Sequence, residues 1–538
     1  MRSPVLALLS ISFTIQTNAQ NWHWATAFLG TGQPQVKSVA ALDDGGALVC
    51  GIFNDTLRTS NDTIVTHGDW DGFLARLDDT GAVLWLSAIG GANFDELHEI
   101  VVDDAGNGFA TGTFSGTVDW NGSDVTGNLG REGVLVKFNL DGEMLWFRRA
   151  NGYSTGYTVA VSDDGVVYWG GLVNDEVMFG NITVTNNNSL FNTYIARYTS
   201  DNGTLMDAQR VTSSGGEQGA FGMDVDGEGN VYLTGYSRPQ PNPYLGSFMA
   251  KVAYGSGTNW MQTVTSASGD VLGHDVSVTS DGHVYFTGKI HNNVTWMGDP
   301  LGQFGRQRNA YLARFSGDGT LDWVQQYGGT NVDEAYAVVC DGLDNAYWTG
   351  RYTGPVAFDT ITVDAIGSST SQDIFVARSE PSGGVAWVSR AGGAGLEEFA
   401  TAIDKRVNGP LIVGGQYSSY YSIFGNDTLP PPLGQRCFVA SMGVPDDELS
   451  TAVDEPSPTT ALQLYPIPTQ DHLFVAMHGA RGAISVDVLD ASGRNVLATR
   501  LGAPLGTIDV HALAPGCYFL RATDPAGQQA TERFVVQR

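Results

Sequence analysis

The sequence predicts an all-β fold built from one unit that is repeated seven times. A tryptophan near the end of a strand-like run recurs with a methionine in one place, at Trp24, Trp85, Trp146, Met206, Trp260, Trp323 and Trp387. The intervals between these positions are 61, 61, 60, 54, 63 and 64 residues. Because a nearly constant period is the mark of a repeat architecture, the period determines the expected fold class before any local pattern does.

Each unit contains four strand-like runs. The first alternates apolar and polar residues and ends in an acidic turn, as in Glu99–Asp103. The second closes on glycine (Val231–Gly235), the third on a basic residue (Tyr194–Arg197), and the fourth carries the tryptophan. Period-two alternation indicates strands, and joints such as Asp-Asp-Gly and Ser-Asp-Gly indicate hairpin turns. Four antiparallel strands per repeat are typical of a propeller blade, so we expect a seven-bladed β-propeller of four-stranded blades.

The two ends of the repeat array predict how the ring closes. The last unit stops after Phe438–Ser441 without a tryptophan strand, and the first tryptophan strand, Trp24–Phe28, precedes the first unit. We therefore expect the N-terminal strand to complete blade seven as its outermost strand, which leaves the ring without an exposed edge.

The repeats resemble the SBBP-type β-propeller repeats of bacterial extracellular proteins. The matching pattern runs from Asp333 to Gly350 and continues in Asp373–Arg378, and the resemblance covers roughly Trp22–Val444. It implies a scaffold and no particular activity. The fourth unit departs from the pattern because its segment Tyr236–Leu245 is short and rich in proline, so we expect a trimmed loop there.

Composition limits the classes of partner. The formal net charge is −29, and the tail from Ala461 onward is neutral because it holds six acids and six arginines. Met442–Thr460 holds five acids and no base, and Arg2 lies in the expected signal peptide, so the repeats carry about −25. Nucleic acid and anionic lipid are poor partners for such a surface, although solubility alone also explains the charge. The four cysteines have no CxxC spacing and predict neither a zinc site nor a disulfide framework.

The N-terminus has the pattern of a secretory signal peptide, residues 1–19. Arg2 precedes the apolar run Val5–Ile15, and Thr17–Ala19 resembles a cleavage site. No later apolar stretch is long enough to span a membrane. We expect the propeller over residues 20–443 and an acidic linker rich in Pro, Ser and Thr over residues 444–460.

The tail, residues 461–538, has the pattern of a small Ig-like β-sandwich. It contains Tyr465-Pro-Ile-Pro468, then Val486–Arg494, then Leu513–Tyr518 and the terminal Phe534-Val-Val. These motifs resemble the type A C-terminal sorting domain of type IX secretion in Bacteroidetes, with Ile467 in place of the usual asparagine. The resemblance implies binding to the type IX translocon and sortase, removal of the tail, attachment of the remainder to surface lipopolysaccharide, and an extracellular or outer-membrane-surface location. A permanent adhesive β-sandwich is the alternative.

A search for chemistry finds no catalytic signature. HExxH, P-loop and GxSxG motifs are absent, and Ser316–Trp323 lacks the spacing of a sialidase Asp box. His98 and His274 lie at corresponding places in two units, but two lone imidazoles are weak evidence for a metal site.

Acidic residues recur in the loops that enter the first strand of successive blades. A ring of carboxylates there would bind Ca²⁺ or a cationic group. Alternatively, each carboxylate accepts backbone N–H bonds from the neighbouring blade. The candidate residues are Asp95, Glu96, Glu217, Asp270, Asp333, Glu334, Glu397 and Glu398.

The loops between second and third strands are long and differ most between units, so they are candidate binding loops. Candidate aromatic platforms for sugar rings, which could instead be hydrophobic covers, are Trp70, Trp120, Trp296 and Tyr420. Four triplets resemble the Bacteroidetes O-glycosylation motif of Asp followed by Thr or Ser and an apolar residue. Their threonines are Thr56, Thr63, Thr360 and Thr428.

Two classes of function remain open. The repeat scaffold, the export tail and the missing catalytic motifs favour a surface binding or adhesion protein with a glycan or another surface protein as ligand. The alternative is a secreted hydrolase or lyase that acts on polysaccharide, with carboxylates such as Asp95 or Asp333 as acid and base. An enzyme should place paired carboxyls asymmetrically, in one or two blades.

Overall fold

A computed structural model of the chain divides it into two compact units, Met1–Glu448 and Leu449–Arg538. The structure describes residues 21–537, except 128–129, 186–189, 212–215, 239–243, 254–256, 267–268, 292–293, 297–298, 302–307, 394–396, 408, 419–420, 431–435, 445–461, 466–468, 470, 478–481, 491–492, 504 and 526–528. The expected signal peptide, and the expected linker except Val444, therefore lie outside the described residues. Within them every element is a strand, and no helix is long and apolar enough to cross a membrane.

The first unit is propeller-like. Its described residues form seven sheets. Each sheet contains four antiparallel strands, and we number the sheets along the chain. Sheet 1 contains β2 (Gln35–Ala41), β3 (Ala47–Phe53), β6 (Asp71–Leu77) and β7 (Val83–Gly91). Sheet 2 contains β8 (Glu96–Val102), β9 (Gly108–Phe114), β12 (Glu132–Phe138) and β13 (Met144–Asn151). Sheet 3 contains β14 (Ser154–Val161), β15 (Val166–Val173), β18 (Asn192–Thr199) and β19 (Leu205–Arg210). Sheets 4 and 5 contain β20 (Glu217–Val225), β21 (Val231–Arg238), β22 (Gly246–Ala253), β23 (Gly257–Val264); and β24 (Val271–Val278), β25 (Val284–Ile290), β28 (Asn309–Phe315), β29 (Leu321–Tyr327). Sheets 6 and 7 contain β30 (Glu334–Cys340), β31 (Ala346–Thr353), β34 (Gln372–Ser379), β35 (Val385–Gly393); and β36 (Glu398–Lys405), β37 (Leu411–Tyr417), β40 (Arg436–Met442), β1 (Trp22–Gly30).

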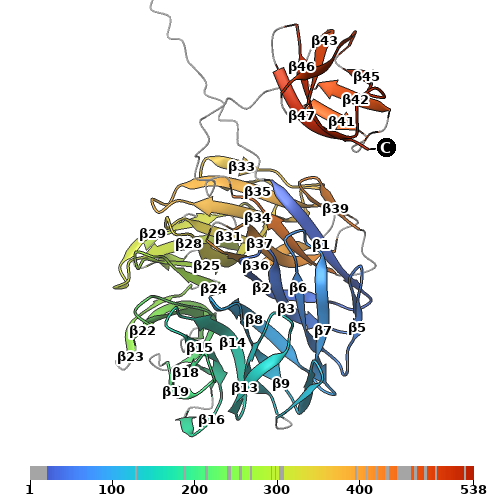
Figure 1. Cartoon of the computed structure of the whole chain (residues 1–538). Coiled ribbons are helices and arrows are strands. Elements are labelled where there is room, and N and C mark those ends of the chain that lie inside the picture. The colour runs from blue at the N-terminus through green and yellow to red at the C-terminus, as the bar shows by residue number, and fades with distance from the viewer. Residues whose placement is uncertain are drawn as a thin grey trace, which may run out of the picture. The chain divides into compact units, whose positions relative to one another are not determined.

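The first strands of the sheets lie side by side around a centre (Figure 1). Each contacts the first strand of the next sheet, from β2 and β8 through to β30 and β36, and β36 in turn contacts β2. Hydrophobic clusters fill the spaces between neighbouring sheets, because both faces of each central strand are buried.

The N-terminal strand β1 completes sheet 7, as the sequence predicts. It pairs antiparallel with β40, with Thr26 opposite Val439 and Phe28 opposite Cys437. Phe28 is fully buried in a cluster that also contains Val36 of sheet 1. One strand from the start of the chain thus closes a sheet whose other three strands come from the end of the repeats.

The recurring tryptophan ties neighbouring sheets together. Its indole N–H donates to a backbone carbonyl in the turn between the third and fourth strands of the next unit. The pairs are Trp24 with Asp79 (2.8 Å), Trp85 with Leu140 (2.9 Å), Trp146 with Ser200 (3.0 Å), Trp260 with Gly317 (3.1 Å) and Trp323 with Pro381 (3.0 Å). Trp387 has no such partner among the described residues. The reason is topological: β40 and β1, the corresponding strands of sheet 7, come from distant parts of the chain, so no turn connects them.

This difference predicts that replacement of tryptophan by phenylalanine lowers the free energy of unfolding by different amounts at Trp24 and Trp387. Trp24 and Trp387 are both 7% exposed, so replacing either by phenylalanine removes a similar buried volume. Only Trp24→Phe also removes a hydrogen bond to Asp79. We expect Trp24→Phe to lower the free energy of unfolding by about 1 kcal/mol more than Trp387→Phe does. Urea unfolding of both variants measures the difference, and equal costs would argue against a stabilising role for the indole N–H.

The long loops between second and third strands form outer hairpins, which the sequence analysis did not predict. Their bounds are β4 (Thr56–Arg58) with β5 (Thr63–Val65), β10 (Thr117–Trp120) with β11 (Ser123–Thr126), β16 (Glu176–Phe179) with β17 (Ile182–Thr185), β26 (Thr295–Trp296) with β27 (Asp299–Pro300), β32 (Val356–Phe358) with β33 (Ile361–Val363), and β38 (Ser422–Phe424) with β39 (Asp427–Leu429).

Each of four hairpins extends the sheet of the preceding unit, since β4, β10, β16 and β38 pair with β1, β7, β13 and β35. Two others approach through single bridges, Ser266 with Val294 and Gly328 with Ala357. The turn at Asn121-Gly122 has φ of 48° and 83°, as a tight hairpin requires. In the fourth unit, residues 239–243 of the expected trimmed loop lie outside the described residues.

The second unit contains two sheets around one core. One sheet comprises β41 (Leu462–Tyr465), β42 (His472–Met477) and β45 (Leu505–Asp509); the other comprises β44 (Asn495–Leu501), β43 (Ile484–Asp490), β46 (Gly516–Thr523) and β47 (Gln529–Val536). Leu473 and Val475 from the first sheet share a hydrophobic cluster with Val486 and Leu520 from the second. This is a small sandwich-like β module.

Candidate functional site: the central channel

A β-bulge at the same place in every first strand shapes the channel. Each bulge leaves one residue without a partner on the second strand, and such bulges redirect side chains. The bulge residues are Lys37, His98, Tyr157, Phe221, His274, Tyr336 and Thr401. They line one cavity of about 420 Å³ to which all seven first strands contribute. The channel is therefore the place where all seven sheets of the first unit meet.

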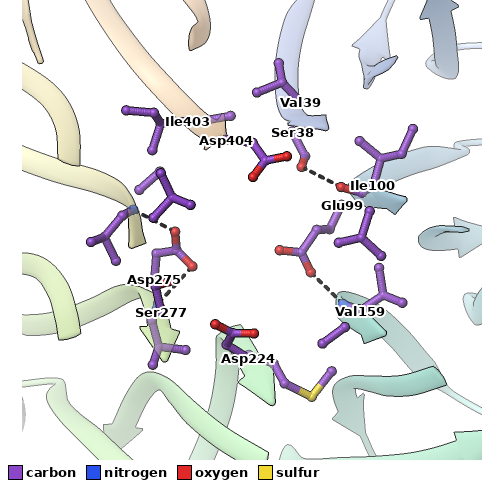
Figure 2. A pocket seen from close by; sticks show the side chains of 18 of the residues that line it. Ser38, Val39, Glu99, Ile100, Val159, Asp224, Asp275, Ser277, Ile403 and Asp404 are labelled. Atoms are coloured by element: carbon purple, nitrogen blue, oxygen red, sulfur yellow. Dashed lines mark hydrogen bonds between the residues drawn. The ribbon is translucent and has the colours of Figure 1, made fainter. Parts of the chain in front are cut away.

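Four carboxyl groups point into this channel: Glu99, Asp224, Asp275 and Asp404 (Figure 2). Each accepts a backbone N–H bond from the first strand of the following sheet. The donors are Val159 to Glu99 (2.5 Å), Val278 to Asp224 (2.8 Å), Val338 to Asp275 (2.8 Å) and Ala41 to Asp404 (2.8 Å). These four carboxyls thus link sheet 2 to 3, 4 to 5, 5 to 6 and 7 to 1.

The four carboxyl groups hold protons more tightly than usual. Burial raises the pKa of Glu99 to about 8, of Asp275 to about 7 and of Asp224 to about 6, and it also raises the pKa of Asp404. Neighbouring carboxyls add to the increase, since Asp275 and Asp224 repel the charge on Glu99. The interior of the channel is consequently less negative at neutral pH than its composition suggests.

These pKa values predict how stability depends on pH. Unfolded Glu99 ionises near pH 4.5 and folded Glu99 near pH 8, so between these values only the folded state holds the proton. Stability therefore falls as the pH rises from about 5 to 8. Glu99→Gln removes this titration, and we expect it to stabilise the protein at pH 8 by roughly 3–4 kcal/mol while changing little at pH 5. Thermal unfolding at both pH values measures the effect, and an equal change at both would contradict a raised pKa.

The channel mouth at which the first strands begin, which we call the amino-end mouth, combines aromatic rings and ion pairs. The rings of His98 and Tyr157 lie 4.6 Å apart, and those of Tyr157 and Phe221 lie 5.5 Å apart. On another side of the mouth, His274 stacks on Tyr336 at 5.0 Å. Half-buried aromatic faces beside charged groups are typical of binding sites for polar ligands.

The acids predicted from the sequence precede or begin the first strands of sheets 2, 4, 5, 6 and 7. Asp95 is buried and accepts N–H bonds from Gly91, the last residue of β7 in sheet 1, and from Ser115 of its own sheet (both 2.8 Å), and Asp270 accepts one from Leu245, which precedes β22 of sheet 4 (2.9 Å). Asp333 is buried and accepts N–H bonds from Gly329 in the loop after β29 (2.7 Å) and from Thr353 of its own sheet (2.9 Å). The bonds to Asp95 and Asp270 are of the inter-sheet kind that the sequence analysis offered as the alternative, and Glu99, Asp224, Asp275 and Asp404 form further bonds of this kind.

The predicted glutamates mostly form ion pairs. Glu96 contacts Arg131 (2.6 Å) and His98 (3.0 Å), and Glu217 contacts Arg238 (3.0 Å). Glu334 contacts several cations, Glu398 is buried and accepts from Ser422 (2.7 Å), and Glu397 is exposed. In the described part of the chain, no group of three His, Cys, Asp or Glu side chains is placed to hold a metal ion.

Two of the four candidate sugar platforms are buried, which fits the alternative of a hydrophobic cover. Trp120 and Trp296 are fully buried in hydrophobic clusters, so neither face is open to a ligand. Trp70 is half-buried with its ring 6.5 Å from Phe94, and Tyr420 lies outside the described residues.

The threonines of the four predicted glycosylation triplets lie on outer hairpins. Thr63, Thr360 and Thr428 are exposed, and Thr56 is half-buried. Their modification stays a prediction.

Sequence reasoning missed Glu99, Asp224, Asp275 and Asp404. The available signal was a carboxylate inside the first strand, at an inward position of the apolar-polar alternation, where the expected residue is apolar. The bulge hides this signal because it shifts which residues face inward by one.

Residues 463–537 match the secretion system C-terminal sorting domain family. This domain indicates export by type IX secretion to the cell surface or extracellular space, and it implies contact with the type IX secretion machinery. The resemblance of the repeats to SBBP-type sequences stays a prediction. No curated protein matches the chain.

Three solved structures are similar to this chain at TM-scores below 0.5. A fungal alcohol oxidase of the AA5 family in complex with copper is 13% identical, covers 97% of this chain and 100% of its own, and has a TM-score of 0.39. The Dos1 propeller is 8% identical, with coverage of 78% and 95% and a TM-score of 0.39. PorZ, a surface component of the type IX secretion system of Porphyromonas gingivalis, is 12% identical, with coverage of 94% and 81% and a TM-score of 0.26. Likeness at these scores carries no argument about activity.

Proposed function

We propose that this chain is a seven-bladed β-propeller that is displayed at the cell surface or released, and that it binds a glycan or another surface protein at its channel. The single observation that carries the proposal is that one chain contains both a sorting domain and a ring of sheets around one cavity. Its support is the cyclic contact of first strands from β2 to β36 and the pairing of β1 with β40. A rigid scaffold of this kind presents a preformed site with little ordering cost.

The tail would act as an address and not as part of the binding site. In this proposal its Ig-like sandwich is recognised by the translocon, the sortase removes it, and the remainder is attached to surface lipopolysaccharide. The sorting-domain match over residues 463–537 supports this step.

An enzyme acting on polysaccharide is the second candidate. Asp275, with its pKa near 7, and Glu99, with its pKa near 8, could hold a proton for transfer in the channel. Against this role, both carboxyls accept backbone N–H bonds that fix them between sheets.

One experiment separates the two candidates. The purified protein is incubated with a panel of polysaccharides and surface proteins, and both binding and the release of new reducing or unsaturated ends are measured. We expect saturable binding without turnover. Turnover that is lost in Asp275→Asn would establish the enzyme, and no binding to any member would count against the binding scaffold.

A further inference from the structure

Three cations surround one buried carboxylate at the amino-end mouth. The Glu334 side chain is 1% exposed and lies 3.2 Å from Lys289, 3.0 Å from Arg308 and 2.5 Å from Arg351. Burial alone would raise the pKa of Glu334, but Arg351 and Lys289 outweigh it and hold the pKa at about 2. Glu334 is therefore fully ionised and neutralises one of the three charges.

In the part of the chain that the structure describes, no second carboxylate forms an ion pair with these cations. Among the described residues, Lys289, Arg308 and Arg351 form ion pairs with Glu334 only. The adjacent Asp333 accepts two backbone N–H bonds, and burial raises its pKa to about 7, so its carboxyl is only partly charged at neutral pH. A local excess of positive charge is unexpected in a chain with a net charge of −29.

Fewer cations pair directly with the corresponding glutamates elsewhere at the mouth. Among the described residues, Glu217 in sheet 4 has a single ion pair, with Arg238. Glu96 in sheet 2 pairs with Arg131 and His98, and the more distant Lys37 also helps to lower its pKa. Glu334 differs because three Lys and Arg side chains pair with it directly.

Aromatic rings and a hydrogen-bond acceptor lie beside the cations. Tyr336 stacks on His274 and lies 5.8 Å from Phe399, over which the Arg351 guanidinium packs at 5.5 Å. His274 Nδ1 lies 2.7 Å from the carbonyl oxygen of Ala335 and must donate to it. Burial and the nearby Lys289 lower the pKa of His274 to about 4, so the ring is neutral and its Nε2 is an acceptor.

We propose that Lys289, Arg308 and Arg351, together with the rings of Tyr336 and Phe399, bind a carboxylate-bearing saccharide, namely a uronic acid residue of an acidic polysaccharide. The inference rests on the proposed function and names the ligand class of its site. Arg308 is half-exposed and supplies a planar fork for the sugar carboxylate. The half-buried rings of Tyr336 and Phe399 supply apolar surface beside the cations for the sugar ring, and His274 Nε2 accepts from a hydroxyl group.

The test uses the purified full chain and calorimetric titration with trigalacturonate and an alginate trisaccharide. Maltotriose is the neutral control, acetate and sulfate are free-anion controls, and polyglutamate is an acidic-peptide control. We expect a uronate trisaccharide to bind, to bind more weakly at high salt, and to bind more tightly than every control.

Two matched variants localise the site. Arg308→Gln leaves Lys289 and Arg351 on Glu334, so the fold is retained, and we expect about tenfold weaker uronate binding. Arg238→Gln removes an arginine of similar exposure, 46% against 48%, from an ordinary ion pair, and we expect less than a twofold change. Melting temperatures of both variants verify folding.

The outcomes distinguish this inference from the proposed function. Equal losses in both variants, or uronate binding no tighter than that of maltotriose, free anions or polyglutamate, would overturn the uronate site. Binding of maltotriose or polyglutamate alone would overturn the site while leaving a binding scaffold in place. Failure of every saccharide, polymer and surface protein would overturn both.

Discussion

Deletion of residues 21–29, which removes nearly all of β1, is expected to unfold the whole propeller-like unit or to lower its melting temperature by tens of degrees. The deletion removes Trp22, Trp24 and Phe28, all buried, and leaves the edge of β40 without a partner. Truncation of a single buried phenylalanine or tryptophan costs about 3–5 kcal/mol, and whole domains are stable by about 5–15 kcal/mol. The loss of three such side chains and a row of strand hydrogen bonds therefore exceeds what a typical domain can tolerate.

A single substitution in β1 tests the same claim, that this strand stabilises sheet 7, without removing the strand. Phe28→Ala should cost about 3–5 kcal/mol, whereas His23→Ala in the same strand should cost less than about 0.5 kcal/mol because His23 is exposed. Circular dichroism during heating measures all three proteins. A deletion variant that melts at the same temperature as the parent would show that β1 does not close the ring.

Removal of the tail is expected to abolish export without unfolding the repeats. The two units have separate hydrophobic cores, so residues 20–444 should fold when expressed alone. In the native host a chain of residues 1–444, which keeps the expected signal peptide and lacks the tail, should stay in the periplasm because the sorting domain is the export address. Cell fractionation and immunoblotting measure the location, with a variant lacking only residues 448–458 as the control. Surface display of the truncated protein would contradict the role of the tail in export.

The repeat could be predicted because its signals are local and periodic. The tryptophan spacing, the turn residues and the missing strand in the last unit together predicted the sheets and the pairing of β1 with β40. The tail was predicted for a similar reason, since Tyr465, Gly493 and Tyr518 lie in short motifs with fixed order.

The site could be predicted only in part because it depends on contacts between units. The bulge before Glu99 and Asp275 changes which side chains face the channel, and pairing with the second strand creates it. Trp120 and Trp296 are buried where the outer hairpins approach a neighbouring sheet, and each loop sequence alone could not decide between a sugar platform and a hydrophobic cover. The charge excess around Glu334 combines residues from sheets 5 and 6 that lie 17 to 45 positions from Glu334 in the sequence.

The central claim, an exported propeller whose tail is an address, is tested most directly by mass spectrometry of protein released from the surface of intact native cells. The account predicts peptides from the repeats, such as those that contain Trp146 or Trp323, and none from Ala480 onward. Intact C-terminal peptides that contain Phe534 on surface-anchored protein would contradict removal of the tail, and a permanent adhesive domain would then be the better account.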